Sequence, residues 1–286
     1  MRLVVVFISL LLLLFLAACN TAEQNGELEE GSTKKEEQPT ESHQEENKDL
    51  TSEETEVENE SETNEEDSTI EEEIVTEKYR VSENWSIVPI EEGTNEKVVL
   101  LTIDDAPDKY ALEMANTLKE LEAGAIFFVN GHFLDTPEEQ EVLKQIHDMG
   151  FLIGNHTYSH PYLPNSSEAE QQEEIIKLND LIEQVIGERP AFFRAPNGAN
   201  TEYTKQIASE EKMVLMNWSY GYDWEEEYRS KEKIIDIMLN SPYLGNGSNL
   251  LMHDREWTAA GLQDIVTGLR EQGYEILDPH EIETIK

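Results

Sequence analysis

The sequence predicts an α/β fold in which parallel strands close into a (β/α) barrel, and three observations lead to it. Short apolar segments of strand character alternate with longer segments of helical periodicity from residue 97 onward, as expected of repeated strand–helix units. About seven or eight strands in about 200 residues favour a compact barrel over an open doubly wound sheet, which stays the alternative. No glycine-rich phosphate loop follows the first strand, and this weakens a nucleotide-binding interpretation.

The individual elements follow from local patterns. The run 97–103 has the uniform hydrophobicity of a buried parallel strand. Apolar residues then recur at helical spacing over 112–121, and Gly124 ends that helix. Further strands are expected at 125–129, 151–154, 191–193, 213–216, 249–252 and 274–277, and further helices at 137–150, 167–186, 230–239 and 257–271.

The first 19 residues have the pattern of a targeting segment. Arg2 precedes an apolar run that is short for a membrane span, which needs about 20 residues. The string Leu16-Ala17-Ala18-Cys19 resembles the lipobox of bacterial lipoproteins, whose cysteine is diacylated and becomes the mature N-terminus. We therefore expect a lipoprotein signal peptide over 1–19 and a diacylglyceryl anchor on Cys19, at the extracytoplasmic face of the bacterial membrane. An ordinary signal peptide is the alternative. Cys19 is the only cysteine, so an internal disulfide is excluded.

Two further regions differ in composition. Residues 20–80 hold 23 acidic and 5 basic side chains and no Trp or Phe. They have too little apolar surface to offset chain entropy, so we expect a disordered acidic linker, acting as a tether or a simple spacer. Residues 81–286 have the length and apolar content of one domain, which we expect to be monomeric. Their 39 acidic and 15 basic side chains argue against nucleic acid or anionic lipid as a partner.

Polar side chains stand where five of the expected strands end. In a barrel these ends meet at one face, where catalytic groups gather. Taken singly, each has an ordinary explanation, such as a helix cap, a surface ion pair or a core histidine. Their joint occurrence favours one functional site, in which two imidazoles and a carboxylate would suit a divalent transition metal. The residues are Asp104, Asp105, His156, His160, Arg194, Asp223, Trp224 and His253.

Five segments, in order, resemble the motifs of the polysaccharide deacetylase family, also called the NodB homology domain. Together they extend over nearly all of the expected domain, and the second and third are specific in combination. The family fold is a distorted (β/α) barrel, which agrees with the fold expected from periodicity. The segments are Thr-Ile-Asp-Asp-Ala-Pro at 102–107, His-Thr-Tyr-Ser-His at 156–160, Arg-Ala-Pro-Asn-Gly at 194–198, Asp-Trp at 223–224 and Leu-Met-His at 251–253.

The resemblance implies a metal centre and a general base. Asp105, His156 and His160 would hold a divalent metal, with zinc expected and cobalt, nickel or manganese as alternatives. Asp104 would take a proton from water, and Arg194 would orient it. Such a metal polarises an amide carbonyl and makes water more acidic, which an unreactive amide requires.

The resemblance also implies a general acid and a binding pocket. His253, held by Asp223, would protonate the departing nitrogen, a step that needs an imidazolium. Trp224 and Leu251 would line the pocket for the acetyl methyl group. The backbone N–H of Asn197 would help to hold the oxyanion.

Three positions depart from the family pattern. Ala106 stands where glycine is usual, and it would add about 1 kcal/mol of strain if the backbone there needs a positive φ. Asn197 stands where an aromatic residue is usual, and Tyr220 stands where an aspartate usually opens the fourth motif. None of these removes a metal ligand, the base or the acid, so we expect activity with altered substrate choice.

The expected function is metal-dependent removal of N-acetyl groups from a cell-surface amino-sugar polysaccharide. Attachment at the membrane favours peptidoglycan, with N-acetylglucosamine or N-acetylmuramic acid as the reacting sugar. Chitin oligomers and O-acetylated polysaccharides are alternatives within the same chemistry. A catalytically silent module that binds glycan in the same cleft is the alternative from another class.

Overall fold

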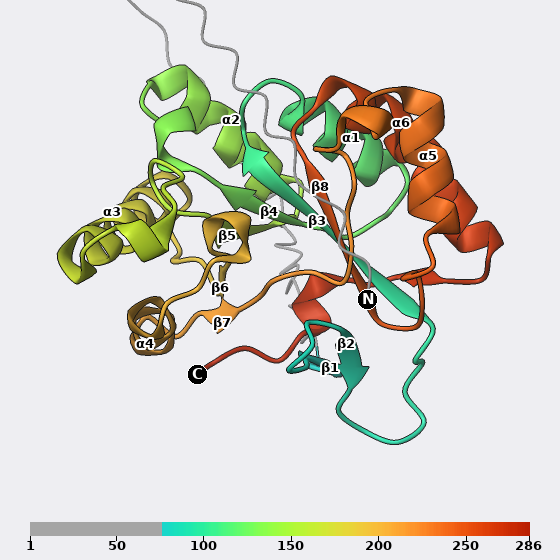
Figure 1. Cartoon of the computed structure of the whole chain (residues 1–286), viewed down its shortest axis with the longest axis horizontal. Coiled ribbons are helices and arrows are strands. Elements are labelled where there is room, and N and C mark those ends of the chain that lie inside the picture. Colours follow the sequence, from blue (N-terminus) through green and yellow to red (C-terminus); the bar gives the residue numbers. More distant parts are fainter. Residues whose placement is uncertain (1–75) are drawn as a thin grey trace, which may run out of the picture. The chain divides into compact units, whose positions relative to one another are not determined.

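A computed structural model describes residues 76–286, which form a curled parallel sheet surrounded by helices (Figure 1). Within this part of the chain the sheet has seven strands in the order β7-β6-β5-β4-β3-β8, and β9 pairs with β3. The predicted barrel of parallel strands is therefore confirmed. The strands are β3 (Val98–Ala106), β4 (Ile126–Val129), β5 (Leu152–Asn155), β6 (Phe192–Phe193), β7 (Val214–Leu215), β8 (Ser248–His253) and β9 (Glu275–Ile276).

The barrel closes through a single bridge rather than a full strand pair. The segment after β7 runs beside β8, where Tyr220 and Leu250 form an isolated parallel bridge. Two backbone hydrogen bonds flank it, from the N–H of Ser219 to the carbonyl of Asn249 at 2.8 Å and from the N–H of Leu251 to the carbonyl of Tyr220 at 2.9 Å. This short closure accounts for the distortion of the barrel.

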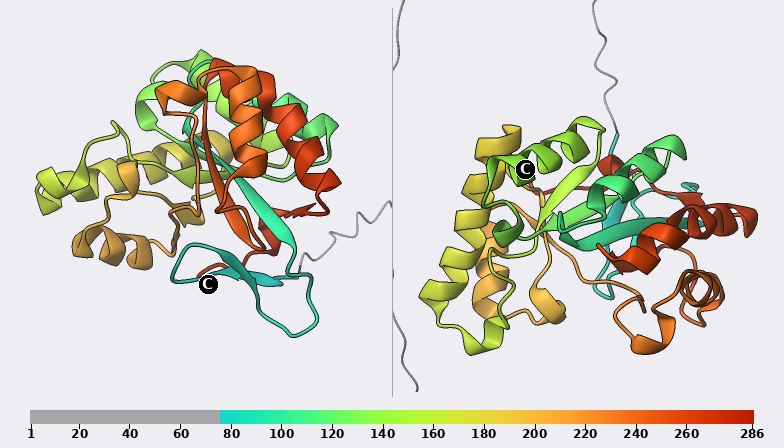
Figure 2. Two further views of the ribbon diagram at one scale, coloured as in Figure 1. Left: turned by 45° about the vertical axis from the view of Figure 1, so that its right-hand side comes forward. Right: turned by 90° about the horizontal axis from the view of Figure 1, so that it is seen from above.

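Six helices of the described chain cover the outside of the sheet (Figures 1 and 2). Neighbouring helices contact one another in the order α4-α3-α2-α1-α6-α5, which follows the order of the strands. Each strand is thereby connected to the next by a helix on the outer face, as in repeated strand–helix units. The helices are α1 (Ala111–Glu120), α2 (Pro137–Asp148), α3 (Glu168–Ile186), α4 (Glu202–Glu210), α5 (Lys231–Asn240) and α6 (Glu256–Glu271).

Local capping explains where the longer helices begin and end. Thr136 caps α2 and forms a reciprocal capping box with Glu139, and Ser167 caps α3 in the same way. Helix α3 ends at Gly187, whose φ of 88° lies in the left-handed region that glycine adopts without strain. These bounds lie close to the ranges 137–150 and 167–186 that the sequence predicted.

Side chains of β3 alternate between the two faces of the sheet. The odd-numbered positions from Val99 to Ile103 belong to the core between sheet and helices. Val98 and Leu100 belong to a second cluster, on the opposite face. The same row continues to Asp104 at the carboxyl end of the strand. Along the inward-facing row of β3, the side chains are therefore apolar at the start of the strand and end with a carboxylate at its carboxyl end.

Two features of the fold were not predicted. An antiparallel hairpin of β1 (Tyr79–Val81) and β2 (Ile87–Pro89) contributes Tyr79 and Ile87 to the inner cluster. Its strands of three residues are too short to show a period. Helix α4 was also missed, because it has nine residues of which three are buried.

The expected signal peptide, lipidated Cys19 and most of the acidic linker lie outside the described residues. The part of the linker that is described includes Tyr79 and Arg80, which belong to β1. No helix between residues 76 and 286 has the length and hydropathy that a bilayer crossing requires.

Candidate active site and metal centre

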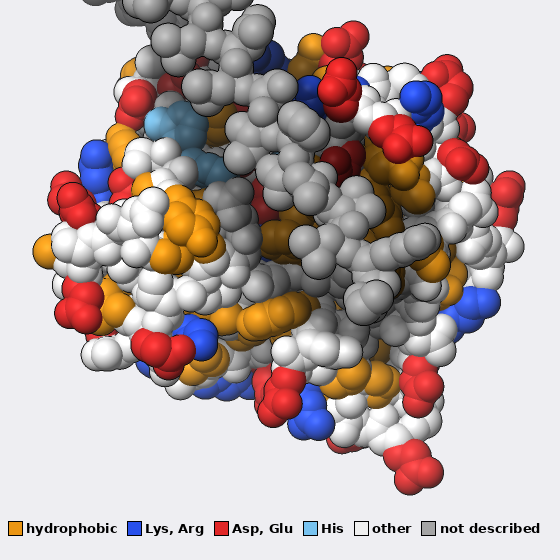
Figure 3. Space-filling model, in the orientation of Figure 1, with side chains coloured by type: hydrophobic (Ala, Val, Ile, Leu, Met, Phe, Trp, Pro, Cys, Tyr) orange, Lys and Arg blue, Asp and Glu red, His pale blue; other side chains and the backbone are white. Residues whose placement is uncertain are grey.

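Most of the predicted residues line one cavity at the carboxyl ends of the strands, and the buried Arg194 and Asp223 support it from behind. Its volume is about 380 Å³. In the space-filling view, histidine side chains gather on this face of the molecule and acidic side chains are spread around its margin (Figure 3). The ten lining residues are Asp104, Asp105, His156, His160, Asn197, Trp218, Trp224, Leu251, His253 and Arg255.

Asp104 is buried and paired with Arg194, which is wholly buried. One guanidinium N–H donates to Oδ1 of Asp104 at 2.7 Å, and the same nitrogen donates to Thr102 at 2.8 Å. The backbone carbonyls of Met216 and Asn217 accept further N–H groups of Arg194. Arg194 is thus fixed by the protein and in turn fixes one oxygen of Asp104.

Asp105 lines the cavity although it follows Asp104 directly in the strand. Strand alternation alone would send its side chain to the helix-covered face. The pairing of β3 with β4 shifts register between Ile103 and Ala106, and Asp105 has a φ of 58°. This local departure from the strand period brings two adjacent carboxylates into one cavity.

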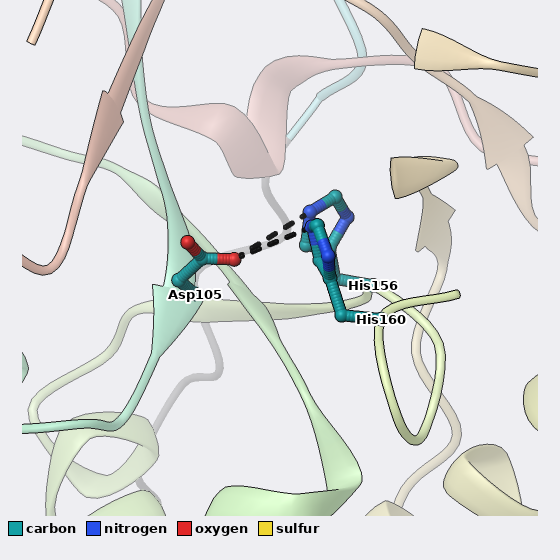
Figure 4. Close-up of side chains that lie close together, drawn as sticks. All are labelled: Asp105, His156 and His160. Carbon is teal, nitrogen blue, oxygen red and sulfur yellow. Dashed lines mark ion pairs between the residues drawn. The ribbon is translucent and has the colours of Figure 1, made fainter. Parts of the chain in front are cut away.

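Asp105 converges with two histidines from the loop after β5 (Figure 4). Its Oδ1 atom lies 3.6 Å from Nε2 of His160 and 4.0 Å from Nε2 of His156. One ligand atom from each of the three residues lies within 4.8 Å of the others. Burial would raise the pKa of Asp105, but His253, the two imidazoles and Arg255 outweigh it and hold the pKa below its usual value.

The environment of His156 suits it to bind a metal. Its Nδ1–H donates to the backbone carbonyl of Arg194 at 2.7 Å, which leaves Nε2 as the free ligand atom. Burial is the largest influence on the ring and lowers the pKa of His156, so the neutral imidazole is favoured. With His160 and Asp105 it forms an N,N,O set that fits zinc or a similar divalent metal.

His253 stands at the end of β8 and is held by Asp223. The Nδ1 atom of His253 lies 2.6 Å from Oδ1 of Asp223, and the backbone N–H of His253 donates to Oδ2 at 2.6 Å. Thr258 donates to the same Oδ2 atom at 2.8 Å, so the aspartate is itself fixed. Burial would lower the pKa of His253, but the charge and hydrogen bond of Asp223 outweigh it and raise the pKa.

One wall of the cavity is aromatic and apolar. Trp224 meets the ring of His253 edge-on with centroids 5.6 Å apart, and it meets Trp218 at 6.4 Å. Leu251 completes this wall. At Gly221 an added Cβ would lie 2.4 Å from the carbonyl of Leu251 and 2.9 Å from the Trp224 ring. The wall therefore leaves no room for a side chain at position 221, so it requires glycine there.

The three departures from the family pattern have different consequences. Ala106 is buried in β3 and does not have a positive φ. The left-handed conformation occurs one residue earlier, at Asp105. Asn197 has a φ of 57° and lines the cavity. Tyr220 is buried in the core between sheet and helices, and its hydroxyl donates to the carbonyl of Met238 at 2.8 Å. Tyr220 is therefore a packing residue.

For three residues of this region no role was predicted from the sequence, although Asp254 stands beside His253 at an expected strand end. Trp218 and Arg255 line the cavity. Asp254 is buried, and its carboxylate accepts four backbone N–H groups from residues 108–111. Its position directly after His253 was the one available signal. Nothing in the spacing of Trp218 or Arg255 indicates that they face a cavity.

Comparison with known proteins places these residues in context. A family model described as Polysaccharide deacetylase matches residues 91–216. The peptidoglycan-N-acetylmuramic acid deacetylase PdaC of Bacillus subtilis is 32% identical over 204 residues, which cover 70% of this chain and 42% of that protein. A solved structure of PdaC covers 64% of this chain and 88% of the PdaC chain, with a TM-score of 0.58. The chain therefore spans less than half of the full length of PdaC.

Of two further relatives, one is named as a deacetylase and the other as a pseudoenzyme. A peptidoglycan-N-acetylglucosamine deacetylase of Bacillus cereus is 30% identical over 200 residues, covering 67% of this chain and 91% of that protein. A solved structure of a CE4 family pseudoenzyme from Bacillus anthracis is 28% identical with a TM-score of 0.58, covering 66% of this chain and 67% of the other. Similarity at this level thus includes both named enzymes and a protein described as a pseudoenzyme.

Proposed function

Because the chain belongs to the polysaccharide deacetylase family, we propose that it hydrolyses N-acetyl groups of peptidoglycan. Relatives named as deacetylases of N-acetylglucosamine and of N-acetylmuramic acid in peptidoglycan support this substrate class. The reaction cleaves the amide carbon–nitrogen bond with water and yields acetate and a free amine. Chitin oligomers and O-acetylated polysaccharides are the alternatives.

The observation that carries the proposal is that candidate acid and base residues line the same cavity as a donor set suited to a metal. Asp104 and His253 occupy paired positions on neighbouring strands. Asp105, His156 and His160 each bring one ligand atom within 4.8 Å of the others. A divalent metal held by these three residues would polarise the amide carbonyl and lower the pKa of water. We propose zinc, with cobalt, nickel or manganese as alternatives.

Asp104 is the proposed general base. Arg194 occupies its Oδ1 atom, so Oδ2 is the oxygen left to accept a proton from water. Oδ2 lies 3.5 Å from Nε2 of His156, at the edge of the proposed metal centre. The buried guanidinium keeps the carboxylate oriented and supplies its counter-charge.

His253 is the proposed general acid. Because Asp223 holds Nδ1, the Nε2–H of the imidazolium is the donor available to the departing nitrogen. The raised pKa of His253 favours the protonated form that this step requires. Trp224 and Leu251 would contact the acetyl methyl group, and the N–H of Asn197 would contribute to oxyanion stabilisation.

A catalytically silent glycan-binding module is the second candidate, favoured by the similarity to the CE4 family pseudoenzyme. The two candidates differ in whether the proposed acid, base and metal ligands catalyse hydrolysis.

We also propose that the protein is a monomer held at the outer face of the bacterial membrane through diacylated Cys19.

Acetate release from defined peptidoglycan and chitin oligosaccharides tests the proposal. The full-length chain in detergent, supplied with zinc, should release acetate, and Asp104→Asn provides the matched inactive control. Binding of these glycans without any acetate release would support the silent module instead.

A further inference from the structure

Arg255 brings a positive charge into the cavity, and the mechanism described above does not use it. It follows β8 and occupies the N-cap position of α6. One terminal nitrogen donates to Oδ2 of Asp105 at 2.7 Å, and the other donates to the backbone carbonyl of Asp254 at 3.0 Å. Its side chain is 35% exposed. Among the ten lining residues it is the one lysine or arginine.

The hydrogen-bonding capacity of Arg255 is only partly used within the described protein. A guanidinium has five N–H donors, and two hydrogen bonds from the Arg255 guanidinium are formed here. Arg194 is different, because its three nitrogens make five hydrogen bonds and its side chain is wholly buried. The hydrogen bonds of Arg194 are therefore made within the protein, whereas Arg255 has further N–H donors that could bond to a bound molecule.

The positive charge of Arg255 is also opposite in sign to the net charge of the domain. Acidic side chains outnumber basic ones by 39 to 15 over residues 81–286. Within the cavity Arg255 is already paired with Asp105, so its remaining N–H groups are the donors available there to an anionic group. A planar guanidinium matches a carboxylate best.

We infer that Arg255 recognises a carboxylate on the reacting sugar, next to the acetamido group. This inference rests on the proposed deacetylase function and narrows its substrate to N-acetylmuramic acid with a free lactyl carboxylate. In that sugar the acetamido group is on C2 and the lactyl ether is on the adjacent C3. Arg255 contacts Asp105, a residue of the proposed metal centre, so it lies one side chain away from the proposed position of the acetamido group.

Three matched substrates test the inference on the full-length protein. The first contains N-acetylmuramic acid with a free lactyl carboxylate, the second has that carboxylate capped as a methylamide, and the third contains N-acetylglucosamine alone. Mass spectrometry of fragments identifies the sugar that has lost its acetyl group. We expect a kcat/KM about 10- to 100-fold higher for the free acid than for the amide, which is the scale of one charge-assisted pair.

Variants assign that preference to Arg255. Arg255→Gln should remove most of it through a higher KM for the free acid, so that kcat/KM for the free acid falls toward the value for the methylamide. Arg255→Lys keeps the charge without the planar fork and should retain part of the preference. Lys109→Gln is the matched control, because it removes one charge from an exposed side chain that does not line this cavity, and it should keep the full preference.

Other outcomes overturn the inference. Equal losses on all three substrates, with weaker zinc binding in a chelator competition, would mean that Arg255 only positions Asp105. Wild-type protein that treats acid and amide alike would also exclude the inferred role. If wild-type protein releases no acetate at all, the proposed function fails. Equilibrium binding then decides separately, since Arg255→Gln must weaken the binding of N-acetylmuramic acid and leave that of N-acetylglucosamine unchanged.

Discussion

Asp104 and His253 occupy directly paired positions on the neighbouring parallel strands β3 and β8. The same register that aligns the apolar residues of both strands therefore also aligns the proposed base and the proposed acid. Each is fixed from outside the pair, Asp104 by Arg194 and His253 by Asp223. Changes to either strand that shift this register would separate the two proton-transfer groups.

The adjacent aspartates should respond differently to substitution. Asp105→Ala should lower zinc affinity and activity together, because it removes one of three proposed ligands. Asp104→Asn should retain zinc but lose about 10² to 10⁴-fold in turnover, the usual scale of general acid–base catalysis. Metal content and acetate release are measured on both variants. Equal metal loss in the two, or an active Asp104→Asn, contradicts this division of roles.

Loss of the charge on Asp223 should change the pH dependence of activity. The pKa of His253 is raised, so the protonated acid persists until pH rises through that pKa, where activity should fall. In Asp223→Asn the pKa of His253 should drop, and the alkaline limb of kcat should move to lower pH by about 1 to 2 units. A pH–rate profile that is unchanged in this variant would exclude His253 as the acid.

The same pair should contribute to stability in a defined pH window. Because the folded pKa of His253 is raised, its stabilisation is fully present below the unfolded value of 6.5 and is lost as pH rises through the folded pKa. Thermal melts should therefore show that wild-type protein and Asp223→Asn differ most at acidic pH. A difference that grows toward alkaline pH would reverse this sign.

Ala106→Gly should be neutral or destabilising, by up to about 1 kcal/mol. Ala106 does not have a positive φ, so glycine would relieve no strain and would add unfolded-state entropy. It would also remove a buried methyl group. Denaturant unfolding of the two proteins measures the difference, and a more stable glycine variant would refute this expectation.

Gly221→Ala should disturb the aromatic wall and lower activity. Its new Cβ would overlap the carbonyl of Leu251 and approach the Trp224 ring, at a cost of about 1 to 3 kcal/mol. Gly245→Ala is the matched control, since no atom lies within 4 Å of a Cβ added there. Melting temperature and acetate release should fall in the first variant and stay near wild type in the second.

Cys19→Ser should release the protein from the membrane or stall its processing. Two acyl chains give stable attachment where one is marginal. Membrane fractionation with detection of the lipidated N-terminus distinguishes the forms. Wild-type protein that is unlipidated and found in the medium would contradict the proposed anchor.

Much of the fold followed from the sequence because its signals are local. The buried run of β3 and the capped helix α3 were expected at nearly the bounds observed. The site residues could be grouped because parallel strands end at one face, whatever the loop conformations. The left-handed turn at Asp105 and the orientation of Arg255 depend on tertiary contacts, and no residue pattern along the chain records them.

The carboxylate of Asp254 gives the loop after β3 a dependence on a distant part of the sequence. It accepts the amide protons of residues 108–111, of which Asp108 is 146 positions away. In evolutionary terms, the two ends of this link are constrained differently. A substitution at 254 leaves four amides without their acceptor, whereas at 108–111 the link depends on the backbone alone. Any restriction on the side chain of Ala111 comes instead from its burial in the core.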